Sequence, residues 1–155
     1  MGKHVFECEL DPSFFESCDQ FGILTGKGMV DVCLEKKETM MLLSLNLKAS
    51  IQTLCDRCNE NMALEVKGDM NLIYKFGIEE SLDESLVILP HDSYQMDLYQ
   101  PIYELFIVSL PTRLLHDEKN CDQEIIQRLR TAEQQNKENV NIDPRWSDLG
   151  KLNNN

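Results

Sequence analysis

Residues 43–53 read Leu-Ser-Leu-Asn-Leu-Lys-Ala-Ser-Ile-Gln-Thr, and apolar and polar side chains alternate along the whole stretch. A period of two places the apolar side chains on one face of a β-strand. Residues 28–34 and 62–76 show the same alternation, and residues 5–10 are a candidate for a further strand. Gly68 interrupts the 62–76 pattern, where we expect a bulge or a bend. Long amphipathic strands in succession predict an antiparallel meander with one solvated face.

Helical patterns follow the strands. Asp97 can cap a helix over residues 98–109, because Pro101 lies in its first turn, where a missing N–H does no harm. A second helix is expected from residue 122 to about residue 136, and Asp-Pro at 143–144 predicts a last short helix that ends near Leu152. The expected fold class is α+β: an antiparallel β-sheet meander of four or more strands, one main helix packed on it, and a helical C-terminal tail.

Length and composition predict a single domain. The chain has 155 residues, of which 42% are hydrophobic, and a chain of this size can bury a substantial core. We expect one α+β domain over residues 1–133, with a polar linker and a short helical tail over residues 134–155. No stretch approaches the roughly 20 apolar residues of a membrane span, and the first residues lack an apolar signal core. These observations predict a cytoplasmic protein with no membrane partner.

The charge of the chain favours one class of partner. Fifteen basic and 27 acidic side chains give a formal net charge of −12. This charge opposes tight, direct binding to a phosphate backbone, whereas it attracts basic proteins, of which ribosomal proteins are the commonest in a cytosol. Many soluble proteins are acidic simply because net charge keeps them dispersed, so the charge alone does not identify the partner.

Two cysteines occupy the expected turn between two strands. Cys55 and Cys58 form a C-x-x-C motif there, and in a reducing compartment such thiols are metal ligands or packed side chains more often than disulfides. A zinc knuckle needs two thiolates on one hairpin turn, and two further ligands close the site. His116 and Cys121, on one short downstream segment, can supply them. Zinc held by these four residues is one hypothesis, and reduced thiols packed in a turn beside an unrelated histidine is the other.

Enzymatic motifs are scarce in the sequence. A thioredoxin-like C-x-x-C opens a helix, whose N-terminus lowers the thiol pKa, and no helical pattern follows Cys58. The sequence also contains no G-x-S-x-G, no phosphate-binding glycine loop and no H-E-x-x-H. We therefore expect no catalytic residues, and Cys18 is expected to be a small apolar filler.

Four motifs carry a resemblance to a known family. They are Cys-x-Arg-Cys at 55–58, Asp-Leu-x-x-x-Ile-x-Glu running into Ser-Leu-Pro over 97–111, His-Asp-x-x-x-Cys at 116–121, and Asp-Pro-Arg-Trp-x-x-Leu-x-x-Leu over 143–152. In this order and spacing they resemble the YceD family of large ribosomal RNA subunit accumulation proteins. The resemblance covers the chain from about residue 24 onward. Many relatives carry an extra cysteine cluster near the C-terminus, where this chain has only Cys121.

The resemblance implies a non-enzymatic factor that large-subunit ribosomal RNA needs for normal accumulation. Together with the charge, it suggests binding to a basic ribosomal protein or to an assembling large subunit. Two alternatives remain open: an enzyme that trims precursor ribosomal RNA with a metal-bound water, and a thiol oxidoreductase that uses the C-x-x-C. The first needs an open coordination position and a basic channel, and the second needs an unusually acidic Cys55.

Overall fold

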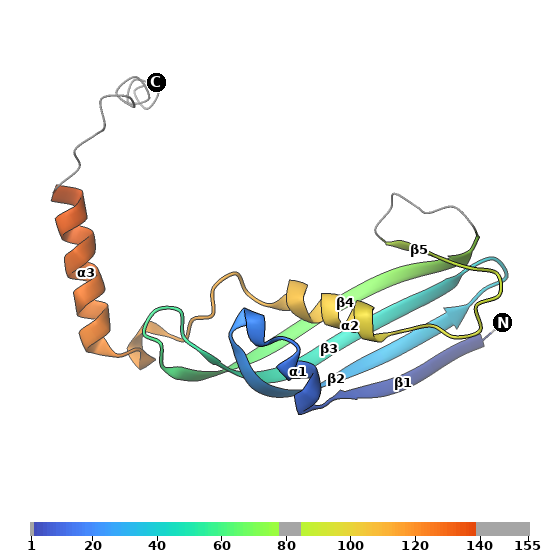
Figure 1. Cartoon of the computed structure of the whole chain (residues 1–155), viewed down its shortest axis with the longest axis horizontal. Coiled ribbons are helices and arrows are strands. Elements are labelled where there is room, and N and C mark those ends of the chain that lie inside the picture. The colour runs from blue at the N-terminus through green and yellow to red at the C-terminus, as the bar shows by residue number, and fades with distance from the viewer. Residues whose placement is uncertain (1, 78–84, 139–155) are drawn as a thin grey trace, which may run out of the picture. The chain divides into compact units, whose positions relative to one another are not determined.

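The computed structural model describes residues 2–77 and 85–138 (Figure 1). The chain divides into two compact units, Met1–Leu115 and His116–Asn155, and each is described by itself. The domain boundary that the sequence predicts at residues 133 and 134 stays a prediction. None of the helices in the described ranges is long and apolar enough to cross a membrane.

The elements are β1 (Gly2–Leu10), α1 (Pro12–Glu16), the 3₁₀ turn η1 (Asp19–Phe21), β2 (Ile23–Lys36), β3 (Met41–Leu54), β4 (Asn61–Phe76), β5 (Leu86–Leu89), α2 (Tyr99–Ser109), the 3₁₀ turn η2 (Glu118–Asn120) and α3 (Gln123–Glu138).

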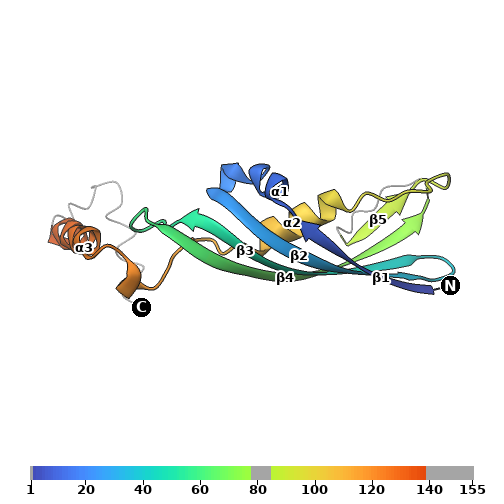
Figure 2. The ribbon, with the colours of Figure 1, turned by 90° about the horizontal axis from the view of Figure 1, so that it is seen from below.

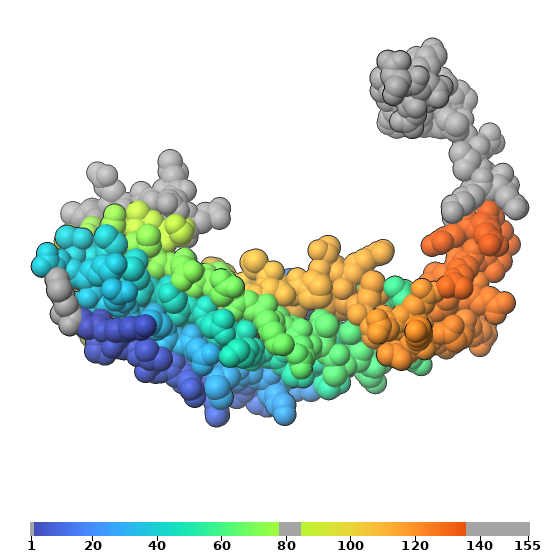
Figure 3. Space-filling view, turned by 180° about the vertical axis from the view of Figure 1, so that it is seen from behind, coloured from blue at the N-terminus to red at the C-terminus, as the bar shows by residue number. Residues whose placement is uncertain are grey.

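Within residues 2–77 and 85–115, the sheet of the first unit has five strands in the order β1-β2-β3-β4-β5. Strands β1 to β4 are antiparallel neighbours, as the alternating pattern predicts. In the described residues, β1 forms one margin of the sheet (Figure 3). The alternation also sets the register, because the apolar positions of β3 face apolar positions of β2 and β4: Leu45 lies opposite Val32 and Met70.

The predicted architecture is wrong in two respects. The sheet is mixed rather than antiparallel throughout, because β5 runs parallel to β4, with Leu86 opposite Ile73. A run of four apolar residues shows no periodicity from which its partner or direction can be deduced. In addition, two helices rather than one main helix pack on the sheet. The predicted helical tail over 143–152 lies outside the described residues.

The helix that the sequence analysis did not predict is α1, which begins directly after β1 and Asp11. The Asp11 carboxylate accepts a hydrogen bond from the Phe14 N–H at 3.1 Å, and Pro12 occupies the first turn, where its missing N–H costs nothing. Hydrogen bonds from the Ser13 hydroxyl and the Phe14 N–H hold the pKa of Asp11 below its usual value. Two phenylalanines in this short helix, Phe14 and Phe15, are buried.

One face of the sheet carries the core and the other faces solvent. Helices α1 and α2 lie on the same side of the sheet (Figure 2). In β3 the odd-numbered residues from Leu43 to Thr53 are buried beneath them, whereas most even-numbered residues are exposed. The core is completed by an aromatic cluster in which Phe14, Phe15 and Phe106 meet edge to face at centroid distances of 5.3 to 5.6 Å. The predicted solvated face is therefore confirmed.

Gly68 has a different role from the predicted bulge. Strand β4 keeps a regular register through Gly68, which lies opposite Leu47. A Cβ atom at this position would lie 1.9 Å from the Ser109 Oγ and 3.1 Å from a Leu105 methyl carbon. The glycine therefore allows the last turn of α2 to contact the sheet backbone closely. α2 begins at Tyr99, one residue later than predicted, and Leu98 rather than Asp97 is its N-cap residue. The Asp97 carboxylate still accepts a hydrogen bond from the Tyr99 N–H at 2.8 Å.

Candidate metal centre

Cys55 and Cys58 lie in the loop that joins β3 to β4, as the sequence predicts. The last strand pair is Leu54 with Asn61, and the Cys55 N–H donates to the Glu60 carbonyl at 2.9 Å. The Asn59 N–H donates to the Cys55 carbonyl at 2.8 Å, and Asn59 adopts the left-handed conformation with φ 61°. Asparagine tolerates this conformation better than most residues. The loop is thus a closed reverse turn that ends in a strand rather than in a helix.

Both cysteines of the loop are buried. Cys55 is 1% exposed and Cys58 is 4% exposed. The Arg57 N–H lies 3.4 Å from the Cys55 Sγ and donates to it. Hydrogen bonds from turn N–H groups stabilise negative charge on sulfur, which a metal-bound thiolate carries.

Asp56 ties the loop to a distant part of the same unit. Its N–H donates to the Leu114 carbonyl at 2.8 Å, and its carboxylate accepts from the Leu114 N–H at 2.7 Å. Sequence reasoning missed this pair, because nothing in the sequence near either residue specifies a contact 58 positions away. Consecutive Cα atoms are about 3.8 Å apart, so two further residues carry the chain from Leu114 to His116. The covalent chain therefore keeps His116 close to the cysteine loop.

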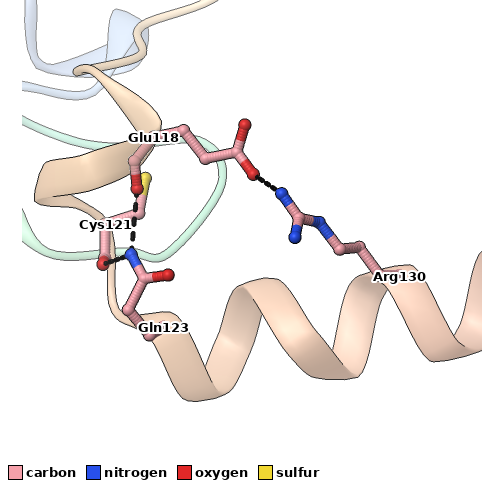
Figure 4. Close-up of polar contacts among 4 residues, drawn as sticks. All are labelled: Glu118, Cys121, Gln123 and Arg130. Atoms are coloured by element: carbon pink, nitrogen blue, oxygen red, sulfur yellow. Dashed lines mark hydrogen bonds and ion pairs between the residues drawn. The ribbon is translucent and has the colours of Figure 1, made fainter.

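The second unit begins with the other two predicted ligands. The Cys121 Sγ lies 3.6 Å from the His116 Nδ1, and Cys121 is buried. The Gln123 side-chain amide donates to the Glu118 carbonyl at 3.1 Å and to the Cys121 carbonyl at 3.0 Å (Figure 4). Arg130 of α3 forms an ion pair with the Glu118 carboxylate. These contacts fix the segment from Glu118 to Cys121 against the first turns of α3.

The four predicted ligands lie close together. One ligand atom from each of Cys55, Cys58, His116 and Cys121 lies within 4.8 Å of all the others, and this group could hold a metal ion. In a tetrahedral site with Zn–S bonds of about 2.3 Å, neighbouring ligand atoms are about 3.8 Å apart, so small adjustments would close the site. Three thiolates and an imidazole are a donor set that suits zinc. Four protein ligands fill a tetrahedral site and leave no position for a reacting water.

The remaining cysteines and histidines lie apart from this group. Cys18 is fully buried, as expected of an apolar filler, and its Sγ lies 3.5 Å from the Phe14 carbonyl. Burial raises the pKa of Cys18, so it is held as a neutral thiol. Cys8 and Cys33 are half-buried, and His91 stacks on Phe76 at a centroid distance of 6.4 Å.

Comparison with known proteins identifies one family. The family model described as large ribosomal RNA subunit accumulation protein YceD matches residues 43–153, which is more than two thirds of the chain. The match begins at β3 and includes all four candidate ligands. No curated protein and no solved structure matches the chain.

Proposed function

Because this chain belongs to the YceD family of large ribosomal RNA subunit accumulation proteins, we propose that it is a non-enzymatic factor in the biogenesis of the large ribosomal subunit. The family membership supports this proposal, because the family name implies a role in the accumulation of large-subunit ribosomal RNA. Assembly of the subunit takes place where ribosomes are made, so we expect the protein to act in the cytoplasm.

The proposed direct partner is a basic ribosomal protein or the assembling subunit that contains it. The net charge of −12 attracts basic surfaces and repels a bare phosphate backbone. On the solvated face of the sheet, Lys48 pairs with Asp31 at 3.6 Å and Lys67 pairs with Glu65 at 3.0 Å. These pairs neutralise lysines that RNA phosphates would otherwise attract. Protection of the RNA would then be indirect, through the protein that the factor delivers or holds.

The proposed role of the metal is structural. Zinc held by Cys55, Cys58, His116 and Cys121 would cross-link the cysteine loop to the segment that contains His116 and Cys121. A closed four-ligand set argues against the metal-dependent RNA-processing enzyme, because such an enzyme needs an open coordination position. A loop that leads into a strand argues against the thiol oxidoreductase, because no helix N-terminus is there to acidify the thiols.

Depletion of the protein in its own cell tests this proposal. The ratio of large-subunit to small-subunit ribosomal RNA should fall on depletion and should recover when the wild-type chain is restored. A Cys55→Ser/Cys58→Ser chain should restore it poorly, whereas a Cys33→Ser chain, which removes a thiol outside the group, should restore it fully. An unchanged RNA ratio would refute the proposed role. If the purified chain bound large-subunit RNA tightly at physiological salt and ignored basic ribosomal proteins, the indirect route would be wrong.

A further inference from the structure

Strand β1 is an edge strand of the sheet along its whole length. All nine of its residues pair with β2, from Gly2 opposite Lys36 to Leu10 opposite Gly28, without a register shift. No other strand in the described residues lies on its outer side (Figure 1). In an antiparallel pair, every second residue directs its N–H and C=O away from its partner strand. β1 therefore presents a regular row of backbone donors and acceptors outward.

This edge lacks several of the features that usually protect an edge strand. Native edges are shortened, bulged, interrupted by proline, covered, or charged, most often with lysine. β1 contains no proline, and its single lysine, Lys3, lies near its start. Two large apolar side chains stand in its middle: Val5 is 66% exposed and Phe6 is 40% exposed. A long, regular and partly apolar edge is a template for a further strand.

The charge along the edge selects the kind of strand that it would accept. Glu7 and Glu9 lie on the solvated face, where Glu7 is opposite Asp31 and Glu9 is opposite Met29. Neither glutamate makes an ion pair within the part of the chain that the structure describes. On the other face, Phe6, Cys8 and Leu10 continue the apolar side of the sheet, because they lie opposite Val32, Val30 and Gly28. A strand added here would place alternate side chains beside acids and beside apolar groups.

We propose that β1 binds an extended, basic segment of the partner protein by β-strand addition, with basic side chains beside Glu7 and Glu9 and apolar side chains beside Phe6. This inference rests on the proposed function, since it names how a basic partner is held. It also concerns a part of the chain outside the family match, which begins at residue 43.

A second copy of the chain fits this edge less well. Antiparallel self-pairing centred on Phe6 would place Lys3 opposite Glu9, but it would place Glu7 opposite Val5 and leave that glutamate without a counter-charge. It would also bring together two chains that each carry a net charge of −12. A basic segment neutralises both glutamates and part of the net charge.

Peptide binding to the full chain tests the proposal. The probe is a labelled peptide of about nine residues that alternates valine and lysine, with fluorescence anisotropy measured at about 0.15 M salt. The control peptide has the same sequence with N-methyl groups on alternate backbone nitrogens. These groups remove backbone hydrogen-bond donors and keep every charge. Glu7→Lys/Glu9→Lys reverses the charge at the edge. The matched control, Glu65→Lys/Asp69→Lys, makes the same charge change on β4, on the same face but near the other margin of the sheet, away from β1.

We expect N-methylation and the Glu7→Lys/Glu9→Lys change each to weaken binding by about tenfold or more, and the control pair to weaken it by less than about threefold. Amide exchange should slow in β1 when the unmodified peptide binds. Equal binding of the N-methylated probe, or equal losses in both variants, would overturn strand addition. A wild-type chain that sediments as a dimer, with β1 amides already protected, would assign the edge to a second copy instead. If the peptide-binding results contradict strand addition but the RNA ratio still falls on depletion, only the docking mode is refuted. If the RNA ratio does not change on depletion, the proposed function is refuted.

Discussion

Asp56 positions a distant segment through two hydrogen bonds to Leu114, one from its backbone and one to its carboxylate. We expect Asp56→Ala to lower zinc affinity by about 10-fold to 100-fold, because groups that orient metal ligands contribute on this scale. Asp56→Asn keeps a side-chain oxygen that can accept a hydrogen bond from the Leu114 N–H, so its zinc affinity should fall much less. Competition with a chromogenic chelator measures the affinity. Glu60→Gln controls for charge in the same loop, and a loss as large as that of Asp56→Ala would show that charge rather than positioning matters.

Tyr74 makes the free energy of unfolding depend on pH in the alkaline range. It is 3% exposed, and its burial, together with the charges of Glu104 and Asp97, raises its pKa above the ordinary value of 10.0. The folded state therefore holds the phenol proton more tightly than the unfolded state does. The resulting stability is fully present below about pH 10 and is lost as the pH rises through the folded pKa. Urea unfolding between pH 8 and pH 11 should show a shallower decline for Tyr74→Phe than for the wild type, and parallel declines would contradict this assignment.

Each of the two pairs of candidate ligands could be predicted because the spacing within the pair is local. Two thiols on one turn, and a histidine five positions before a cysteine, are visible without knowledge of the fold. The bond between Asp56 and Leu114 could not be predicted, because it depends on where the chain returns after β5 and α2. Periodicity reports which face a residue occupies, but it does not report which distant backbone group will lie beside it.

The contact between α2 and β4 depends on the missing side chain of Gly68. In Gly68→Ala the new methyl group would overlap the Ser109 hydroxyl, so we expect a loss of about 1–3 kcal/mol in the free energy of unfolding. Adding Ser109→Gly removes the overlapping atoms and should recover part of this loss. Urea denaturation of the two single variants and the double variant measures the coupling. If the two changes in the free energy of unfolding simply added in the double variant, Ser109 would not limit the space at residue 68.

At the element scale, the long strands were predictable and the short elements were not. Strands β2, β3 and β4 extend over 14 to 16 residues, so their alternation repeats many times. β5 has four residues and α1 has five, which is too short for any period to be visible. Gly68 was misinterpreted for a different reason: a glycine in a strand pattern indicates either a bulge or a close approach, and only the position of α2 distinguishes the two.

The proposed zinc would be held by four residues whose ligand atoms lie within 4.8 Å of one another: Cys55, Cys58, His116 and Cys121. Protein purified without added metal should contain about one equivalent of zinc, because three thiolates and an imidazole form a closed structural site. Chelation should lower the melting temperature and increase proteolysis near residues 116–121. Cys58→Ser should lose the metal, and Cys33→Ser, which removes a thiol from outside the group, should retain it. Less than half an equivalent of zinc in a fully folded protein would count against the site.

The separation between Asp56 and Leu114 also affects synthesis of the protein. The cysteine loop leaves the ribosome well before the segment that completes its surroundings, because the two bonded residues are 58 positions apart. At a translation rate of about 5–20 residues per second, this delay lasts about 3–12 s. Throughout that interval the nascent chain exposes two thiols whose neighbours have not yet been made. The protein would thus depend, during its own elongation, on the reducing conditions of the compartment in which it is translated.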